Sequence, residues 1–333
     1  MNKYFKAGGI MVKIRIYRKN EKRGDKKGVL LLALLFFILF PYIVSSFSEV
    51  EKQSIAVEEV PGQIYVVEEK IWGGQKIPLE EYLTGMMAAT IPVEYEPEVL
   101  KAQAIILRSF CMNHMKKEGG EKIIKDEKIT DYYFSKQECE ELWGEKTGSY
   151  LEKIQAAIHE TKGIILVCNG DIVEAPFSRM SNGKTRDITE YVIRKENYEH
   201  MKTVVCSKDE LAKDFVQYME ISKKEFEDII RKLVNMNSNE IQKIVLYRDS
   251  NNYVKEVQIG EEMIDGEKFR EAFNLISSSF SLDKIDGIIE IKTKGIGHGF
   301  GFSQYEANQL ALSGRDYMYL LNYFFDNITF EKV

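Results

Sequence analysis

A histidine set among alternating glycines is the clearest candidate for chemistry in this 333-residue chain. Residues 295–301 read GIGHGFG, with His298 at the centre. Glycine at every second position permits positive φ and lets a second backbone or a ligand approach closely. The run lacks the Lys-Ser/Thr ending of a phosphate-binding loop. We therefore expect His298 either to line a binding site or to brace the local backbone.

A second polar run, residues 178–186, reads SRMSNGKTR and follows a strand-like segment. Its hydroxyls, its amide and its cations are the groups that a sugar-binding cleft uses. The same residues also suit an exposed turn built on Asn182 and Gly183. The residue types alone leave both interpretations open.

The four cysteines, at positions 111, 139, 168 and 206, are widely separated in the sequence. They form no CxxC pair, so a zinc ribbon is not indicated. Cys111 and His114 are spaced to share a helix face, but two ligands do not make a metal site. We expect buried free thiols and predict neither a metal nor a cofactor.

Two helices should position the polar segments. The first is predicted over residues 78–89, because its apolar side chains recur at helical spacing: Leu79, Tyr82, Leu83, Met86 and Met87. Thr90 falls on the same stripe, so a polar side chain is expected to face inward. The second helix should begin after Pro92, with Pro97 at a first-turn position. Glu96 and Glu98 then lie at the positive end of its dipole, which is a sufficient structural reason for both.

Strand signals dominate the second half of the chain. Residues 64–69, 163–170, 241–247, 253–259 and 287–293 are rich in β-forming side chains. Residues 249–252, DSNN, predict a hairpin turn between two of these strands. Ser222 and Glu225 form a capping-box pattern ahead of an amphipathic helix. Early helices followed by later strands indicate an α+β fold.

The charge of the chain is unevenly distributed. Residues 1–28 carry ten Lys or Arg and two Asp or Glu, so the net charge of −6 leaves −14 for the rest. An acidic body repels phosphates, and nucleic acid is therefore not predicted as a partner.

An uncharged run over residues 29–47 predicts a transmembrane anchor. The basic tail of residues 1–28 precedes it and acidic residues follow it, which places the N-terminus in the cytosol and the C-terminal domain outside. A cleaved signal peptide is the alternative, although the run is longer than a usual apolar region and no small-residue cleavage site follows it. Residues 48–75 are predicted as a stalk with a first strand, and residues 76–333 as the outer domain.

Taken in order, these segments resemble the SpoIID/LytB family. The matching motifs are LEEY at residues 79–82, LKAQA at 100–104, SNGKT at 181–185, GEKFR at 266–270 and GHGFGFSQYEANQLALSGRDY at 297–317. The resemblance covers the chain from about residue 50 to 325. Several motifs in the family's order are more specific than any one of them.

The resemblance implies a peptidoglycan lytic transglycosylase, which cuts between N-acetylmuramic acid and N-acetylglucosamine and leaves a 1,6-anhydro end. One carboxyl group suffices, because it protonates the leaving oxygen and then accepts the proton of the sugar's own 6-hydroxyl. No metal or cofactor is implied. A setting in spore engulfment, a partner amidase that removes stem peptides, and membrane-bound sporulation proteins are implied as well.

The chain departs from the family's pattern at the end of the first helix. The family has Glu-Met-Pro there and its glutamate is implied as the acid, whereas residues 90–92 of this chain read TIP. A threonine hydroxyl cannot exchange protons near neutral pH, because general acid catalysis needs a pKa close to the working pH. Glu98, Glu94 or Glu96 could replace the acid only if its carboxyl group reached the same place.

We therefore predict an α+β outer domain with a groove where the helix pair meets the closing Gly-His-Gly segment, and with Thr90 at the groove's floor. The residues expected to line it are Arg108, Ser181, Asn182, Lys184, Thr185, His298, Ser303 and Gln304. The preferred hypothesis is a membrane-anchored protein that binds and remodels glycan strands without the usual acid. The alternatives are an active transglycosylase using Glu98 or a neighbouring glutamate, and a membrane scaffold that docks a protein partner.

Overall fold

A computed structural model describes residues 2–7, 10–15, 63–68, 75–117, 123–125, 133–192, 198–234, 244–285 and 287–333. Within the predicted basic tail, β1 (Asn2–Ala7) and β2 (Ile10–Arg15) form a two-stranded sheet. The predicted transmembrane segment, residues 29–47, lies outside the described residues. No helix among the residues that are described combines the length and apolar character needed to cross a bilayer. The elements from β3 to β16 belong to one structural unit.

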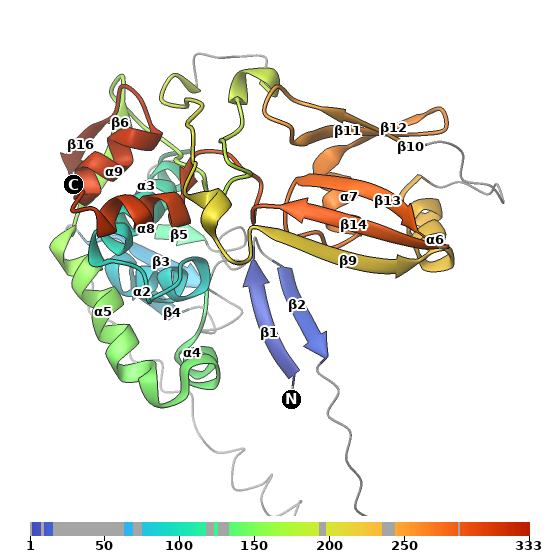
Figure 1. The fold of residues 1–333 in the computed structure, drawn as a ribbon. Helices are drawn as coiled ribbons and strands as arrows, with labels where there is room; N and C mark the ends of the chain where they lie inside the picture. Colours follow the sequence, from blue (N-terminus) through green and yellow to red (C-terminus); the bar gives the residue numbers. More distant parts are fainter. Residues whose placement is uncertain are drawn as a thin grey trace, which may run out of the picture. The chain divides into compact units, whose positions relative to one another are not determined.

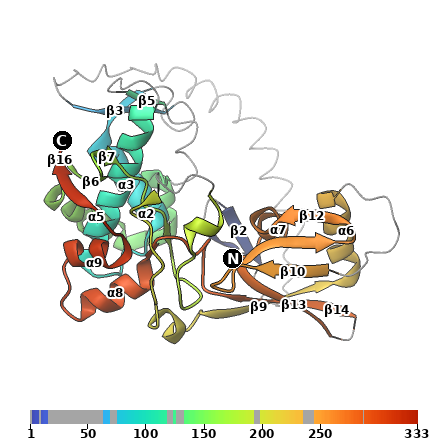
Figure 2. The ribbon, with the colours of Figure 1, turned by 90° about the horizontal axis from the view of Figure 1, so that it is seen from above.

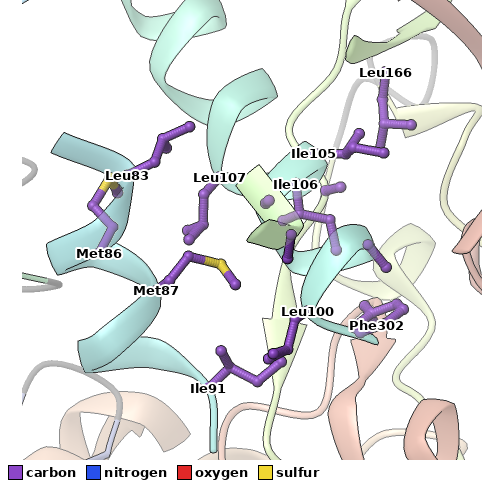
Figure 3. Packing of buried hydrophobic residues seen from close by; sticks show 14 of the residues in the cluster. Leu83, Met86, Met87, Ile91, Leu100, Ile105, Ile106, Leu107, Leu166 and Phe302 are labelled. Atoms are coloured by element: carbon purple, nitrogen blue, oxygen red, sulfur yellow. The ribbon is translucent and has the colours of Figure 1, made fainter. Parts of the chain in front are cut away.

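The predicted helix pair is confirmed as α2 (Leu79–Thr90) and α3 (Pro97–Lys117). Both pack against α5 (Thr147–Glu160), which the sequence analysis did not anticipate (Figure 1). Met87 of α2 and Leu107 of α3 extend into the space between the two helices (Figure 3). Nearly every face of α3 is buried, which explains why its apolar residues do not form a single stripe.

The end of the chain returns to this helix pair. Two helices, α8 (Gln304–Leu312) and α9 (Tyr317–Phe324), pack on α3, and the last strand, β16 (Thr329–Lys332), pairs with β6 (Ile164–Cys168). A short β7 (Asp171–Ile172) completes this sheet. The predicted strand over residues 163–170 is thereby confirmed, and its nearly continuous burial fits a strand covered on both faces.

A small sheet and a short helix flank the helix pair. The sheet has the order β4-β3-β5, formed by β3 (Tyr65–Glu68), β4 (Gln75–Pro78) and β5 (Ile123–Lys125). The strand predicted over residues 64–69 is therefore confirmed. The helix α4 (Lys136–Trp143) starts with a capping box in which Ser135 and Glu138 bond each other's backbone.

A second hydrophobic cluster lies among the later strands and the helices α6 (Lys223–Val234) and α7 (Gly266–Ala272). One sheet has the order β13-β14-β9, built from β13 (Ser279–Ile285), β14 (Ile288–Lys294) and β9 (Val216–Ser222), whose strands lie side by side in Figures 1 and 2. The other has the order β10-β11-β12, from β10 (Ile244–Arg248), β11 (Val254–Ile259) and β12 (Glu262–Asp265). The predicted α+β class, the late strands and the hairpin between β10 and β11 are confirmed.

The glycine segment packs against the polar run of residues 178–186, so the close neighbour that its alternation allows is a backbone segment and not a ligand at these positions. A Cβ on Gly301, whose φ is +68°, would lie 2.1 Å from the carbonyl oxygen of Pro176. A Cβ on Gly295 would lie 2.4 Å from the carbonyl oxygen of Ser181. The strand β15 (Phe302–Ser303) pairs in parallel with β8 (Phe177–Ser178), and Met180 bridges to Ile296. The glycines are required because one backbone lies directly on the other.

All four cysteines are buried thiols, as predicted from their spacing. Cys111 lies within the core of the helix pair, where burial raises the pKa of its thiol to about 12. Burial likewise raises the pKa of Cys139 to about 11. Both thiols therefore stay protonated at neutral pH, which makes them poor nucleophiles and poor metal ligands.

Candidate functional site

Thr90, the last residue of α2, meets side chains from two other segments. Its hydroxyl donates to the carbonyl of Met86 at 2.8 Å, and its own carbonyl accepts from Gln304 Nε2 at 2.9 Å. The same Nε2 donates to Gln103 Oε1 of α3 at 3.1 Å. Gln103 Nε2 and Gln304 Oε1 are buried and have no hydrogen-bond partner within the described part of the chain. Beside the half-buried Thr90 there is thus a pair of amides with unused hydrogen-bonding capacity.

Glu98, the alternative acid, is occupied by structural contacts. Its Oε1 accepts from Lys101 Nζ at 2.7 Å, and its Oε2 accepts from the backbone N–H of Tyr317 at 3.0 Å. The second bond satisfies the first N–H of α9, which has no partner within its own helix. Glu98 therefore ties the start of α3 to the start of α9.

Replacing Glu98 with glutamine is expected to change little. The amide oxygen can still accept from Tyr317, and only the partly buried ion pair with Lys101 is lost, at a cost of about 1 kcal/mol in the free energy of unfolding. Urea unfolding followed by circular dichroism measures this cost. If Glu98 were the acid, the same variant would also abolish any release of anhydro-ended glycan by the parent protein, which mass spectrometry detects.

Arg108 was expected to line the groove, but the structure places it inside the helix pair. Its Nε and Nη2 donate to the two carboxylate oxygens of Glu80, each at 2.8 Å, and Nη1 donates to the carbonyl of Ile164 at 3.1 Å. The side chain is 1% exposed. This bidentate pair explains why the buried guanidinium is tolerated, and it leaves no donor facing a ligand.

The predicted residues of the SNGKT motif divide into two groups. Ser181 and Thr185 are buried and hold the loop, because Ser181 Oγ accepts from the Gly183 N–H at 3.1 Å and Thr185 Oγ1 accepts from the Val204 N–H at 2.8 Å. Asn182 is half-buried, and Lys184 is exposed. Only this second group can meet a ligand.

A buried aspartate that the sequence analysis missed joins this motif to the closing one. Asp209, at the start of a 3₁₀ turn (Asp209–Leu211), accepts from the Ser181 N–H at 2.7 Å and from Ser303 Oγ at 2.7 Å. Burial is the main reason that its pKa rises to about 7, with Glu306 adding repulsion. Its surroundings in the sequence, CSKDEL, contain no pattern that would have singled it out.

The raised pKa of Asp209 predicts a pH-dependent stability. Since the folded protein holds this proton more tightly than the unfolded chain, the contribution is complete below the ordinary pKa of 3.8 and is lost as the pH rises through about 7. Asp209→Asn keeps an oxygen that can accept from the Ser181 N–H. Between pH 5 and pH 8, the free energy of unfolding should therefore fall by about 2–4 kcal/mol less in this variant than in the parent. Urea unfolding at both pH values gives this difference, and parallel losses would contradict the prediction.

His298 braces the glycine segment, one of the two roles left open by the sequence. Its Nδ1 accepts from the Phe300 N–H at 3.0 Å and lies 3.4 Å from Ser178 Oγ, which itself accepts from the Gly299 N–H at 2.9 Å. Burial lowers the pKa of His298 to about 4, so the ring is neutral at pH 7. A neutral ring that accepts at Nδ1 carries its proton on Nε2.

Arg186, at the end of the polar run, connects it to the later strands. Its Nε donates to Asp249 at 3.1 Å and its Nη1 donates to Glu267 at 2.7 Å. The guanidinium also lies over the rings of Tyr191 and Phe300, 4.4 and 4.7 Å from their centroids. Only 1% of the Arg186 side chain is exposed. Arg186 therefore holds these segments together and does not bind a ligand.

A polar hollow of about 530 Å³ opens beside the SNGKT motif. Its lining consists of Asn182, Gly183, Lys184, Glu210, Arg248, Ser250, Asn251, Asn252, Ser279, Phe280, Ser281, Lys292 and Lys294. Two predicted site residues, Asn182 and Lys184, are among them. Thr90, His298, Ser303 and Gln304 lie outside this lining, so the hollow is not the groove that was expected between the helix pair and the closing segment. The described ranges also contain no group of three or more His, Cys, Asp or Glu placed to hold a metal.

This chain is similar to known proteins over most of its length. The family model SpoIID, described as Stage II sporulation protein, matches residues 68–168, which contain the helix pair and β6. The Stage II sporulation protein D of Bacillus amyloliquefaciens is 29% identical over 281 residues, covering 83% of this chain and 80% of the relative. That of Bacillus subtilis (strain 168) is 27% identical over 314 residues, covering 89% of this chain and 90% of the relative.

This protein belongs to the class of mixed α+β proteins. Its domain combines a helix pair with a closing glycine segment that packs on a polar run. The matches confirm the resemblance noted from the motifs and support the assignment of the chain to the SpoIID family.

Proposed function

We propose that this protein binds peptidoglycan glycan strands and takes part in cell-wall remodelling during sporulation, without the acid that cleavage would need. The names of its relatives support the sporulation setting. The observation that carries the binding proposal is the polar site at the end of α2. There the buried amides of Gln103 and Gln304 adjoin Thr90 and leave a donor and an acceptor unused.

The contacts of Thr90 support the absence of catalysis. Its hydroxyl is bonded to the carbonyl of Met86, four residues earlier on the same helix. An alcohol in this bond neither donates a proton to a leaving oxygen nor recovers one near neutral pH. The alternative acid Glu98 has both carboxylate oxygens in structural hydrogen bonds.

The setting of the proposed function follows from the sequence. Residues 29–47 would anchor the protein in the cell membrane, with the N-terminus in the cytosol and the domain outside, where peptidoglycan lies. An amidase that removes stem peptides would supply peptide-free strands, and membrane-bound sporulation proteins would be neighbours. Each of these parts belongs to the proposal.

Retention of the full chain on immobilised peptide-free glycan strands tests the proposal. The parent protein, purified in detergent, should be retained on the strands and not on cellulose, which lacks acetamido groups. Thr90→Arg should reduce retention by about tenfold, because a long charged side chain at this position would disturb the two amides and hinder the approach of a glycan strand to them.

Thr84→Arg is the matched control. Thr84 is also half-buried and on α2, but six residues earlier, so it points to a different side of the helix. The Thr84→Arg variant should be retained on the strands to the same extent as the parent. Equal retention of the two variants, or no retention of the parent, would contradict glycan binding at Thr90, and capture of a protein in place of glycan would favour a scaffold.

A further inference from the structure

The polar hollow beside the SNGKT motif owes part of its lining to strand alternation. Ser279 and Ser281 on β13 pair directly with Lys294 and Lys292 on β14. Side chains two residues apart on a strand share a face, so these four residues form one polar surface. The opposite face carries Phe280 and Ile291 into the second hydrophobic cluster. Position in the sheet thus forces two lysines towards the same hollow.

Four cations converge on the hollow: Lys184, Arg248, Lys292 and Lys294. None of the four forms an ion pair with a carboxylate of the described residues, although lysines and arginines elsewhere do, such as Lys101, Lys202 and Arg270. Lys292 lies over the ring of Tyr218, at 5.7 Å from its centroid. Positive charge is therefore gathered there without neutralisation, on a body that is acidic in total.

Arg248 is fixed in position by neutral groups. Its Nη1 donates to the carbonyl of Asn252 at 2.9 Å and its Nη2 donates to the carbonyl of Phe280 at 2.6 Å. These bonds orient the guanidinium through neutral acceptors, and the neighbouring Asp249 acts on it electrostatically without forming an ion pair with it among the described residues. Glu210 is the acidic residue in the lining, and its carboxylate lies against Gly183, where a Cβ would come within 2.3 Å of Oε1. The lining therefore carries a net charge of +3, from four cations and one carboxylate.

The uncharged part of the lining is rich in hydroxyls and amides. It includes Ser250, Asn251 and Asn252 of the β10–β11 turn in addition to Asn182 and the two serines of β13. Such groups pair with the hydroxyl and acetamido groups of sugars, whereas a purely apolar pocket would exclude them. The combination of a positive field with many neutral hydrogen-bonding groups fits a ligand that is both polyhydroxylated and anionic.

We propose that this hollow is a subsite for a carboxylate-bearing saccharide, in which the four cations recognise the carboxylate and the amides and hydroxyls recognise the sugar. The identity of the saccharide rests on the proposed function: N-acetylmuramic acid in a peptide-free strand exposes a lactyl carboxylate, whereas N-acetylglucosamine has no charge.

The test compares the full-length parent with Lys184→Gln/Lys294→Gln, since both lysines are exposed and their removal should leave the fold intact. Affinity is measured for peptide-free strands and for the same strands after conversion of their carboxylates to neutral amides. The parent should bind the native strands about tenfold more tightly, and the variant should bind both alike. Lys162→Gln/Lys268→Gln removes the same charge at exposed positions outside the hollow and should behave like the parent.

Failure of this inference and failure of the proposed function are distinguishable. If the parent binds native and amidated strands equally, or if both double variants behave alike, the carboxylate subsite is wrong while glycan binding stands. If the parent binds no strands, saturation-transfer NMR with N-acetylmuramic acid and with N-acetylglucosamine tests the carboxylate subsite independently of strand binding. A signal for the acid alone, lost in Lys184→Gln/Lys294→Gln, would uphold the subsite, and no signal would overturn it.

Discussion

Under the proposed function, Thr90→Glu is expected to convert glycan binding into glycan cleavage. The substitution places a carboxyl group at the end of α2, beside the amides of Gln103 and Gln304. A correctly placed general acid contributes about 10²–10⁴-fold to the rate of such a reaction. Incubation of the variant with peptide-free strands should therefore release products with 1,6-anhydro ends, which mass spectrometry identifies.

Thr90→Gln is the matched control for this gain of activity. It has nearly the same shape as the glutamate variant and cannot donate a proton at neutral pH, so it should release no anhydro product. Release by the parent or by Thr90→Gln would show that the acid lies elsewhere. A glutamate variant that is folded and retained on strands but releases nothing would show that residue 90 does not lie beside the scissile oxygen.

The largest expected loss of stability follows from Arg186→Met. The substitution removes the positive charge between Asp249, which is fully buried, and Glu267. A carboxylate left buried without its partner costs about 3–5 kcal/mol in the free energy of unfolding. The loss should also weaken the contact of the polar run with β10 and α7, because Tyr191 bonds to both Arg186 and Asp249. Urea unfolding at pH 7 measures the effect.

Arg231→Met on α6 is the control for Arg186→Met. Arg231 pairs with Glu227 and Asp228, but its side chain is 30% exposed and solvent can replace the lost contacts. Its removal should cost about 0–1 kcal/mol. Similar losses for both variants would refute the structural role of Arg186. If Arg186→Met does not fold, Arg186→Lys, which keeps the charge but not the planar fork, should unfold at lower urea than the parent.

Local patterns predicted much of the fold because they depend on neighbours in the sequence. Helical spacing gave α2 and α3, β-rich runs gave β6, β10, β11 and β14, and alternating glycines predicted the close approach of either a backbone or a ligand. The helix α5 was missed, since its buried residues are few and its exposed face dominates its composition. Its place is decided by packing on α2 and α3, not by its own periodicity.

Charged residues show where the sequence was insufficient. Arg108 and Lys184 are both cations within recognised motifs, yet Arg108 is neutralised by Glu80, 28 positions away, and Lys184 is left without a carboxylate partner among the residues described. Asp209 carries no motif, and burial raises its pKa although the hydrogen bonds from Ser181 and Ser303 act in the opposite direction. In each case the role of the charge depends on residues that are distant along the chain.

The amino-acid sequence by itself determined the helix pair, the strands, the contact-making glycines and the threonine at the position where the resemblance implies an acid, because each is encoded in adjacent or regularly spaced residues. Only the tertiary structure decided that Glu98 caps α9, that His298 braces a loop, and that four cations surround one hollow. Burial and pairing between segments far apart in the chain determine charge and access, and these are properties of the folded molecule alone.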